Sequence, residues 1–323
     1  MKQEKVVKLK QNKAIAQIYD NLQRNIIGQE ELVKNLIIAL LAGGHVLLEG
    51  MPGLAKTKSA ETLANSIQGD FKRIQFTPDL LPSDLVGTDI YLQGKSKFEF
   101  AEGPLFANII LADEINRAPA KVQSALLEAM AEKHITVGKQ TYDLPELFLV
   151  IATQNPIEQE GTYNLPEAQL DRFLLHVKID YPESADELKI LEQFETPAKK
   201  SATTKVQPKD ILKMQKEVSE VYLDPKLKKY IVDLIMATRE PEKFDKELKG
   251  YINYGASPRA TLALCQTAKA LAYLEGEEYV TPYHIQNMAV NVLRHRIILS
   301  YKAEAENVIP EQIIKHLIDL VAV

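Results

Sequence analysis

A glycine-rich segment that carries a lysine and a threonine follows a short apolar run. The run 45–49 is followed by GMPGLAKT at 50–57 and then by residues with helical spacing. A strand, a glycine-rich turn and a helix N-terminus, in this order, predict a phosphate-binding loop, because backbone N–H groups and the helix dipole converge on an anion. Lys56 would reach the outer phosphates of a triphosphate, and Thr57 would help to hold Mg²⁺. We expect the binding segment to consist of Gly50, Met51, Pro52, Gly53, Leu54, Ala55, Lys56, Thr57 and Lys58.

One residue of this segment departs from the general pattern. Ala55 occupies the position before the lysine, where a glycine is usually expected. A Cβ is tolerated there if φ is negative, but a positive φ would cost roughly 1–2 kcal/mol.

Two adjacent carboxylates end a second apolar run. Asp113 and Glu114 follow Asn108–Ala112, and an acid at the carboxyl end of a buried parallel strand faces the crevice where ligands of α/β sheets bind. Asp113 would hold Mg²⁺, directly or through water, and Glu114 would orient and polarise an attacking water. The alternative is that the pair caps the helix that starts near 118–119.

Two further polar residues follow strand-like or helical segments. Asn155 comes after Leu147–Thr153, where its amide could lie between a water and the γ-phosphate, although Asn155-Pro156 taken by itself is more simply a turn. Arg172 ends a short helical segment before the last strand. It could pair with Asp171 or other acids of its own chain, or it could enter the nucleotide site of a neighbouring chain.

The elements that must position these residues alternate between strand and helix up to about residue 180. This alternation predicts an α/β domain with a parallel sheet flanked by helices. The expected strands are His45–Glu49, Arg73–Phe76, Asn108–Asp113, Leu147–Thr153 and Leu174–Ile179, and the expected helices are Thr57–Ser66, Lys121–Glu132 and Pro166–Arg172.

The pattern then becomes helical. We expect residues 1–182 to form the N-terminal helices and the nucleotide-binding domain, 183–208 a connecting helix and linker, and 209–323 an all-α lid domain. Within 183–208, Thr196–Pro208 reads as the linker. The expected lid helices are Ile211–Val221, Pro225–Thr238, Pro258–Glu275 and Pro282–Ser300.

Composition limits the class of protein. The chain has 323 residues, 46% of them apolar, and a formal net charge of -5, which disfavours nucleic-acid binding by overall charge. The single cysteine, Cys265, cannot form an internal disulfide. The most apolar stretch is shorter than the ~20 residues that a membrane span needs. We expect a cytoplasmic protein with no membrane insertion.

The order of the motifs resembles the AAA+ ATPases and, within them, the MoxR family. The resemblance rests on GMPGLAKT, IILADEINRAP, IATQNP, LPEAQLDRF and GASPRA, and it covers nearly the whole chain. It implies a P-loop AAA+ core followed by a lid, with ATP and Mg²⁺ as cofactors. By this likeness Lys56 and Thr57 belong to Walker A, Asp113 and Glu114 to Walker B, and the segment with Ile27 and Gly28 passes the adenine base. In the same way Asn155 matches sensor 1, Arg172 an arginine finger acting in trans, and Arg259 sensor 2.

The residues around Arg259 give a separate argument for an anion. Ser257 and Pro258 are typical of a helix start, where a cation is disfavoured by the dipole. A nucleotide phosphate would explain the arginine, while simple exposure to water is the alternative. Whether Arg259 would serve its own site or a neighbour's stays open.

Two segments, 89–100 and 133–142, predict β-hairpin insertions. Hairpins of this kind could engage a client or could pack between subunits.

The resemblance implies a homo-oligomeric ring, usually a hexamer, that hydrolyses ATP and remodels or matures protein clients in a chaperone-like way. It also implies partners with von Willebrand factor A-type domains. The alternatives are an AAA+ nucleic-acid motor or helicase, a metal-chelatase-type motor subunit, or a non-catalytic scaffold gated by ATP.

Overall fold

Five apolar strands pair in parallel to form the central sheet, in the order β2–β5–β8–β1–β9. The strands are β1 Val46–Gly50, β2 Phe71–Gln75, β5 Ile109–Asp113, β8 Leu149–Gln154 and β9 Leu175–Ile179. The computed structural model describes residues 12–92, 94, 97–157, 161–195 and 205–323. All five predicted strands are confirmed, and each end lies within two residues of its predicted position.

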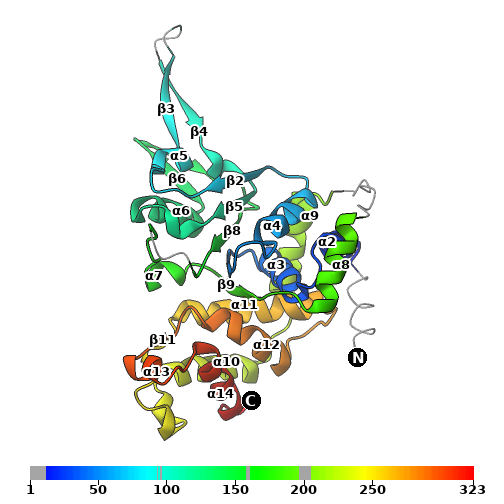
Figure 1. Cartoon of the computed structure of the whole chain (residues 1–323), viewed down its shortest axis with the longest axis vertical. Coiled ribbons are helices and arrows are strands. Elements are labelled where there is room, and N and C mark those ends of the chain that lie inside the picture. The colour runs from blue at the N-terminus through cyan, green and yellow to red at the C-terminus, as the bar shows by residue number, and fades with distance from the viewer. Residues whose placement is uncertain (1–11, 93, 95–96, 158–160, 196–204) are drawn as a thin grey trace.

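Alternate residues of the strands face two separate apolar cores, because successive side chains of a strand point to opposite faces. Val46 and Leu48 of β1 belong to the core that α2, α3 and α4 cover. Leu47 belongs to the core under α5 and α6. The helices are α2 Lys13–Asn25, α3 Glu30–Ala42, α4 Lys56–Asn65, α5 Pro82–Val86 and α6 Ala120–Glu132. The sheet is therefore the middle layer of the predicted α/β domain (Figure 1).

The second half of the chain is helical, as predicted. Helix α8 (Ser184–Glu195) leads away from β9. The lid contains α9 Pro208–Glu220, α10 Pro225–Arg239, α11 Pro258–Leu274, α12 Pro282–Leu293, α13 Tyr301–Ala305 and α14 Pro310–Leu320. Five of these helices begin with proline. The first N–H of a helix has no acceptor within the helix, so the absence of this N–H in proline costs no hydrogen bond.

Two details of the predicted elements differ, and a third lies largely outside the described residues. The helix predicted for 282–300 ends at Leu293, and Ile298–Leu299 (β11) pairs with Ile252–Tyr254 (β10) in a short antiparallel ribbon. The helix predicted for 166–172 is the single turn α7, Glu167–Leu170. Most of the predicted linker, 196–204, lies outside the described residues.

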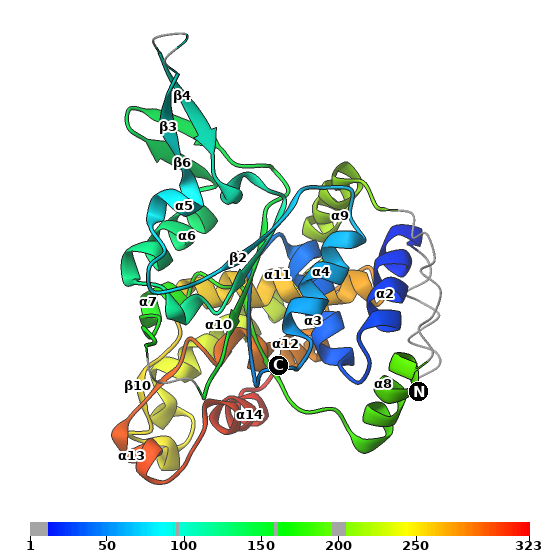
Figure 2. The same cartoon turned by 45° about the horizontal axis from the view of Figure 1, so that its top comes forward.

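The lid and the α/β domain share one of the two cores. Buried residues of α9, α10, α11 and α12 form a single cluster with those of α3 and of the strands. Figure 2 shows α11 passing behind the strands of the sheet, and α11 packs against α3 and α12. The lid is therefore packed directly on α3 and on the sheet.

Both predicted hairpins are present. Strands β3 (Gly87–Leu92) and β4 (Lys97–Glu102) form one, and β6 (His134–Val137) and β7 (Gln140–Asp143) form the other. The hairpins are joined by stacking of Phe100 on Tyr142, with ring centroids 4.2 Å apart. The longer hairpin projects from the α/β domain (Figure 1), and near its tip Tyr91 and Phe98 are 50% and 69% exposed.

Within the described part of the chain, none of the helices has the length and apolar character to cross a membrane.

His45 fixes the start of β1. Its Nδ1 accepts the N–H of Val150 at 3.0 Å, so Nε2 carries the proton and donates to the carbonyl of Met130 at 3.2 Å. The ring is buried, and burial lowers the pKa of His45 to about 4. The neutral imidazole thus connects β1, β8 and α6.

This histidine should make the fold acid-sensitive. The unfolded chain takes up a proton at His45 below about pH 6.5, whereas the folded chain resists until about pH 4. The free energy of unfolding should therefore fall between pH 6.5 and 4, by as much as about 3 kcal/mol from this group. Denaturant titrations at several pH values should show a shallower decline for His45→Gln. An equal decline in both proteins would contradict the assignment.

Candidate active site

The predicted phosphate-binding loop lies between β1 and α4. A Cβ on Gly50 would lie 2.8 Å from the carbonyl oxygen of Ile179, so the approach of β9 requires glycine there. Gly53 has a φ of +85°, which glycine adopts without strain. No side chain caps the start of α4, and an anion would satisfy the N–H groups of its first turn. Of the other predicted loop residues, Leu54 is buried, Met51 is half-buried, and Pro52 and Lys58 are exposed.

Ala55 adopts the strained alternative that its sequence position left open. Its φ of 57° and ψ of 17° lie in the left-handed region. A Cβ in this region costs roughly 1–2 kcal/mol. The loop therefore keeps the conformation that a glycine would adopt, although the residue is alanine.

Lys56 and Thr57 connect the loop to the neighbouring strands. The Lys56 ammonium donates to the carbonyl of Gly50 and, at 3.1 Å, to that of Gln154 at the end of β8. The Thr57 hydroxyl donates to Asp113 Oδ2 at 3.3 Å. The structure therefore brings Lys56, Thr57 and Asp113 together at the carboxyl edge of the sheet.

Asp113 is buried and held by three neighbours. Thr153 donates its hydroxyl proton to Oδ1 at 2.6 Å. Arg73 on β2 donates to Oδ2 from Nη2 at 2.7 Å and from Nε at 3.2 Å. Hydroxyl and carboxylate oxygens are ligands that Mg²⁺ prefers, so Thr57 and Asp113 fit such an ion. In this structure the charge of Asp113 is balanced by Arg73.

Glu114 has a left-handed backbone, with a φ of 56° and a ψ of 51°. Its N–H donates to Thr153 Oγ1 at 2.8 Å, and Oε2 accepts from Gln75 at 2.9 Å and from Arg117 at 3.0 Å. The next α-helix begins at Ala120, and Glu114 makes no side-chain cap. The capping alternative is therefore wrong for Glu114, and the strained backbone directs its carboxylate differently from that of Asp113.

Asn155 is buried one residue beyond the carbonyl that Lys56 contacts. Its Oδ1 accepts the N–H of Ile157 at 3.3 Å, so the side chain also forms the turn that the sequence suggested. The segment with Ile27 and Gly28 lies against Pro182 and Asp186, just beyond β9, and Ile179 of β9 is paired with Gly50 of the loop. Gly28 has a φ of +71°, and a Cβ there would lie 2.8 Å from the Cβ of Asp186.

Arg172 is not joined to the loop residues. Its Nη1 donates to the carbonyl of Leu127 in α6 at 2.7 Å. Asp171, the acidic partner considered from the sequence, is paired with Arg296 and Ser257 instead. The preceding α7 lies apart from α4 in both views (Figures 1 and 2).

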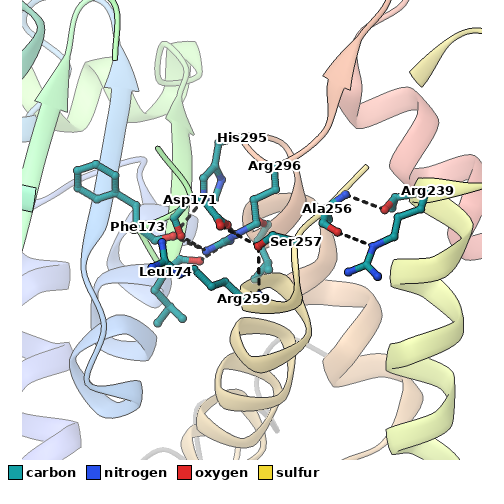
Figure 3. A network of polar contacts seen from close by, with 11 residues as sticks. Asp171, Phe173, Leu174, Arg239, Ala256, Ser257, Arg259, His295 and Arg296 are labelled. Atoms are coloured by element: carbon teal, nitrogen blue, oxygen red, sulfur yellow. Dashed lines mark hydrogen bonds and ion pairs between the residues drawn. The ribbon is translucent and has the colours of Figure 1, made fainter. Parts of the chain in front are cut away.

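Arg259 lies in the first turn of α11, as predicted. Ser257 is the N-cap and accepts the N–H of Arg259 at 3.1 Å. Figure 3 shows the exposed Arg259 side chain extending beside Leu174. This places a cation of the lid next to the α/β domain.

Sequence reasoning missed the residues that hold the two carboxylates. Arg73 and Gln75 lie on the edge strand β2, and Thr153 lies at the end of β8. Arg73 and Gln75 are two positions apart on one strand, so their side chains point to the same face. This spacing of two polar residues is the signal that could have identified them.

Comparison with known proteins agrees with this geometry. The sequence model described as "ATPase family associated with various cellular activities (AAA)" matches residues 45–175, and that of an AAA lid domain matches 247–317. Over 305 residues the chain is 46% identical to Chaperone MoxR1 of Mycobacterium tuberculosis. The match covers 93% of this chain and 80% of that protein. The chain belongs to the MoxR family of AAA+ ATPases.

Other relatives extend across the same length. The protein YeaC of Bacillus subtilis is 43% identical over 94% of this chain and 93% of its own. A crystal structure from Cytophaga hutchinsonii, described provisionally as an ATPase, has 46% identity and a TM-score of 0.90, and covers 99% of this chain and 97% of that one. This MoxR-family protein is thus a nucleotide-binding ATPase with an AAA domain and a lid.

The strain at Ala55 can be measured directly. Ala55→Gly should raise the free energy of unfolding by up to about 1 kcal/mol, because relief of the left-handed Cβ exceeds the added freedom of the unfolded chain. The midpoint of thermal unfolding should rise by roughly 1–3 °C.

Ala131 provides a matched control, because it is an exposed alanine in the right-handed helix α6. Ala131→Gly should lower the midpoint instead. If both variants lowered it equally, the strain at Ala55 would be disproved.

Proposed function

We propose that the chain acts in the cytoplasm as a ring-forming, Mg-ATP-dependent ATPase that remodels or matures protein clients. The observation that carries the proposal is the separation of two groups of residues. Lys56, Thr57 and Asp113 meet at one edge of the sheet, whereas Arg172 is bonded to α6 of its own chain. A second copy would supply the missing arginine, which makes the assembled ring the active form.

The roles follow from the geometry of the site. The loop from Gly50 to Lys58 would bind the phosphates, with Lys56 turning from its two carbonyl partners to the β- and γ-phosphates. Thr57 and Asp113 would hold Mg²⁺, which supplies positive charge that neutralises the phosphate oxygens. Arg73 would then have to leave the Asp113 oxygen that it now contacts.

Glu114 is placed to act on water. Its carboxylate would accept a proton as the water oxygen attacks the γ-phosphorus and the bond to the bridging oxygen of ADP breaks. Asn155 would orient that water, and the neighbour's Arg172 would stabilise the charge that develops, an effect worth about 10³–10⁵ in rate. Arg259 would connect the nucleotide to the lid, and the segment with Ile27 and Gly28 would lie along the adenine.

A protein client is favoured over nucleic acid by the surface of the longer hairpin. Among its described residues, the exposed aromatic pair Tyr91 and Phe98 is accompanied by three acids, Asp89, Glu99 and Glu102, and by one cation, Lys97, which pairs with Glu99. This excess of acids over cations disfavours a phosphate backbone. We infer that clients reach this hairpin either directly or through a partner with a von Willebrand factor A-type domain.

Two variants should separate binding from turnover. Glu114→Gln should bind Mg-ATP with near wild-type affinity in calorimetry but should hydrolyse it at least ~10²-fold more slowly, since only the acceptor of the proton is lost. Lys56→Ala should lose binding. Turnover by Glu114→Gln at the parent rate would show that another group activates the water.

The client class can be tested with the same variant. Glu114→Gln with ATP should retain bound proteins that Lys56→Ala does not, and changing both Tyr91 and Phe98 to serine should reduce their recovery. Wild-type hydrolysis should change less than about twofold on addition of single-stranded DNA, duplex DNA or RNA. Strong stimulation by a nucleic acid would support the motor alternative and contradict a protein client.

A further inference from the structure

Arg296 is a buried arginine of the lid that the sequence analysis did not select. It follows α12, and its side chain is only 3% exposed. All five N–H donors of its guanidinium are used. Nε bonds Asp171 Oδ1 at 2.7 Å, Nη2 bonds the carbonyls of Asp171 at 3.2 Å and Phe173 at 2.6 Å, and Nη1 bonds those of Leu174 at 3.2 Å and Val292.

Four of these five acceptors belong to the stretch 171–174 of the α/β domain. Arg172 lies inside this stretch, with bonded carbonyls on both sides of it. His295 adds a further contact from the lid, with Nε2 3.1 Å from the carbonyl of Phe173. The backbone that carries Arg172 is therefore attached to the lid rather than to the sheet alone (Figure 3).

The same stretch is joined to the helix of Arg259. The Ser257 hydroxyl donates to Asp171 Oδ2 at 2.7 Å and caps α11, where it accepts the N–H of Arg259. The two oxygens of one carboxylate thus connect Arg296 with the start of α11. Any shift of α11 would displace Asp171 and, with it, the following Arg172.

A guanidinium is required for this arrangement. Its planar group presents donors in fixed directions, while a lysine ammonium has three donors and cannot reach the same set of acceptors. Burial lowers the pKa of Arg296, and the hydrogen bond with Asp171 opposes this effect. The buried guanidinium, with its five hydrogen bonds, therefore connects the two domains rigidly.

We propose that Arg296 is a positioning residue for Arg172, so that the lid of a subunit determines where this subunit presents its arginine to the next nucleotide site. The inference rests on the proposed action of Arg172 in trans. It adds that the nucleotide state of one subunit, acting through the lid of that subunit, alters ATP hydrolysis in the neighbouring subunit.

Mixed rings of two chains test both statements separately. The donor chain carries Glu114→Gln, so its own site is stalled but its Arg172 is intact. The site chain carries Arg172→Ala, so its own site is intact but it offers no arginine. Each chain alone should hydrolyse ATP slowly, and their mixture should regain activity. If the mixture stayed inactive while rings formed, the trans action would be wrong, and the inference would fall with it.

Arg296→Lys is then placed in one chain at a time. In the donor chain it should lower kcat of the mixture by roughly 10–100-fold with KM for ATP unchanged, since a displacement of about 1 Å is enough for such a loss. In the site chain, which has no Arg172 to position, it should change the rate less than about twofold. A loss that is equal in both placements, or larger in the site chain, would overturn the proposal.

Arg294→Lys in the donor chain is the matched control. Arg294 is also largely buried but pairs with Glu311, away from the stretch 171–174. It should leave the regained activity unchanged. Should Arg296→Lys fail to fold, as judged by circular dichroism and ring assembly, Asp171→Asn in the donor chain provides the same test. Normal activity of the mixture with Asp171→Asn would contradict the proposal.

Discussion

The site depends on the register of three parallel strands. Leu48 of β1 lies opposite Thr153 of β8, and Leu111 of β5 lies opposite Ile151 of the same strand. Because the strands are parallel and in this register, their carboxyl ends stop at one edge of the sheet. At that edge Lys56 contacts the carbonyl of Gln154, and Thr57 and Thr153 contact Asp113. A shift of β8 along its neighbours would move Thr153 and Gln154 away from these partners.

Two residues at this edge have left-handed backbones although neither is a glycine. Ala55 and Glu114 each hold a conformation that costs free energy, and such strain persists only where the surrounding structure fixes it. At Glu114 the fixing contact is Thr153, which accepts the Glu114 N–H and donates to Asp113. One hydroxyl on β8 therefore contacts both the backbone of Glu114 and the carboxylate of Asp113. Ala55 directly precedes α4, whose start has no side-chain cap and is suited to phosphate.

The sequence predicted what depends on local pattern and missed what depends on distant packing. The strands, the loop and the hairpins follow from periodicity and turn residues, and all were found. The sign of φ at Ala55 was left open, because only the folded loop determines it. The ribbon of β10 and β11 was missed because two or three residues give no periodicity. The contact of Arg296 with Asp171 joins residues 125 positions apart, so no local sequence pattern could predict it.

In the proposed ring the lid would do more than cover the nucleotide, because it holds the stretch that carries Arg172 and contains the helix that carries Arg259. Hydrolysis in a ring of such chains would therefore be coupled between neighbours. The most direct measurement is a cryo-EM structure of the assembled Glu114→Gln protein with Mg-ATP. The account predicts a γ-phosphate in contact with Lys56 of one subunit and Arg172 of the next. Nucleotide bound away from Lys56, or Arg172 still bonded to Leu127 of its own chain beside every filled site, would contradict it.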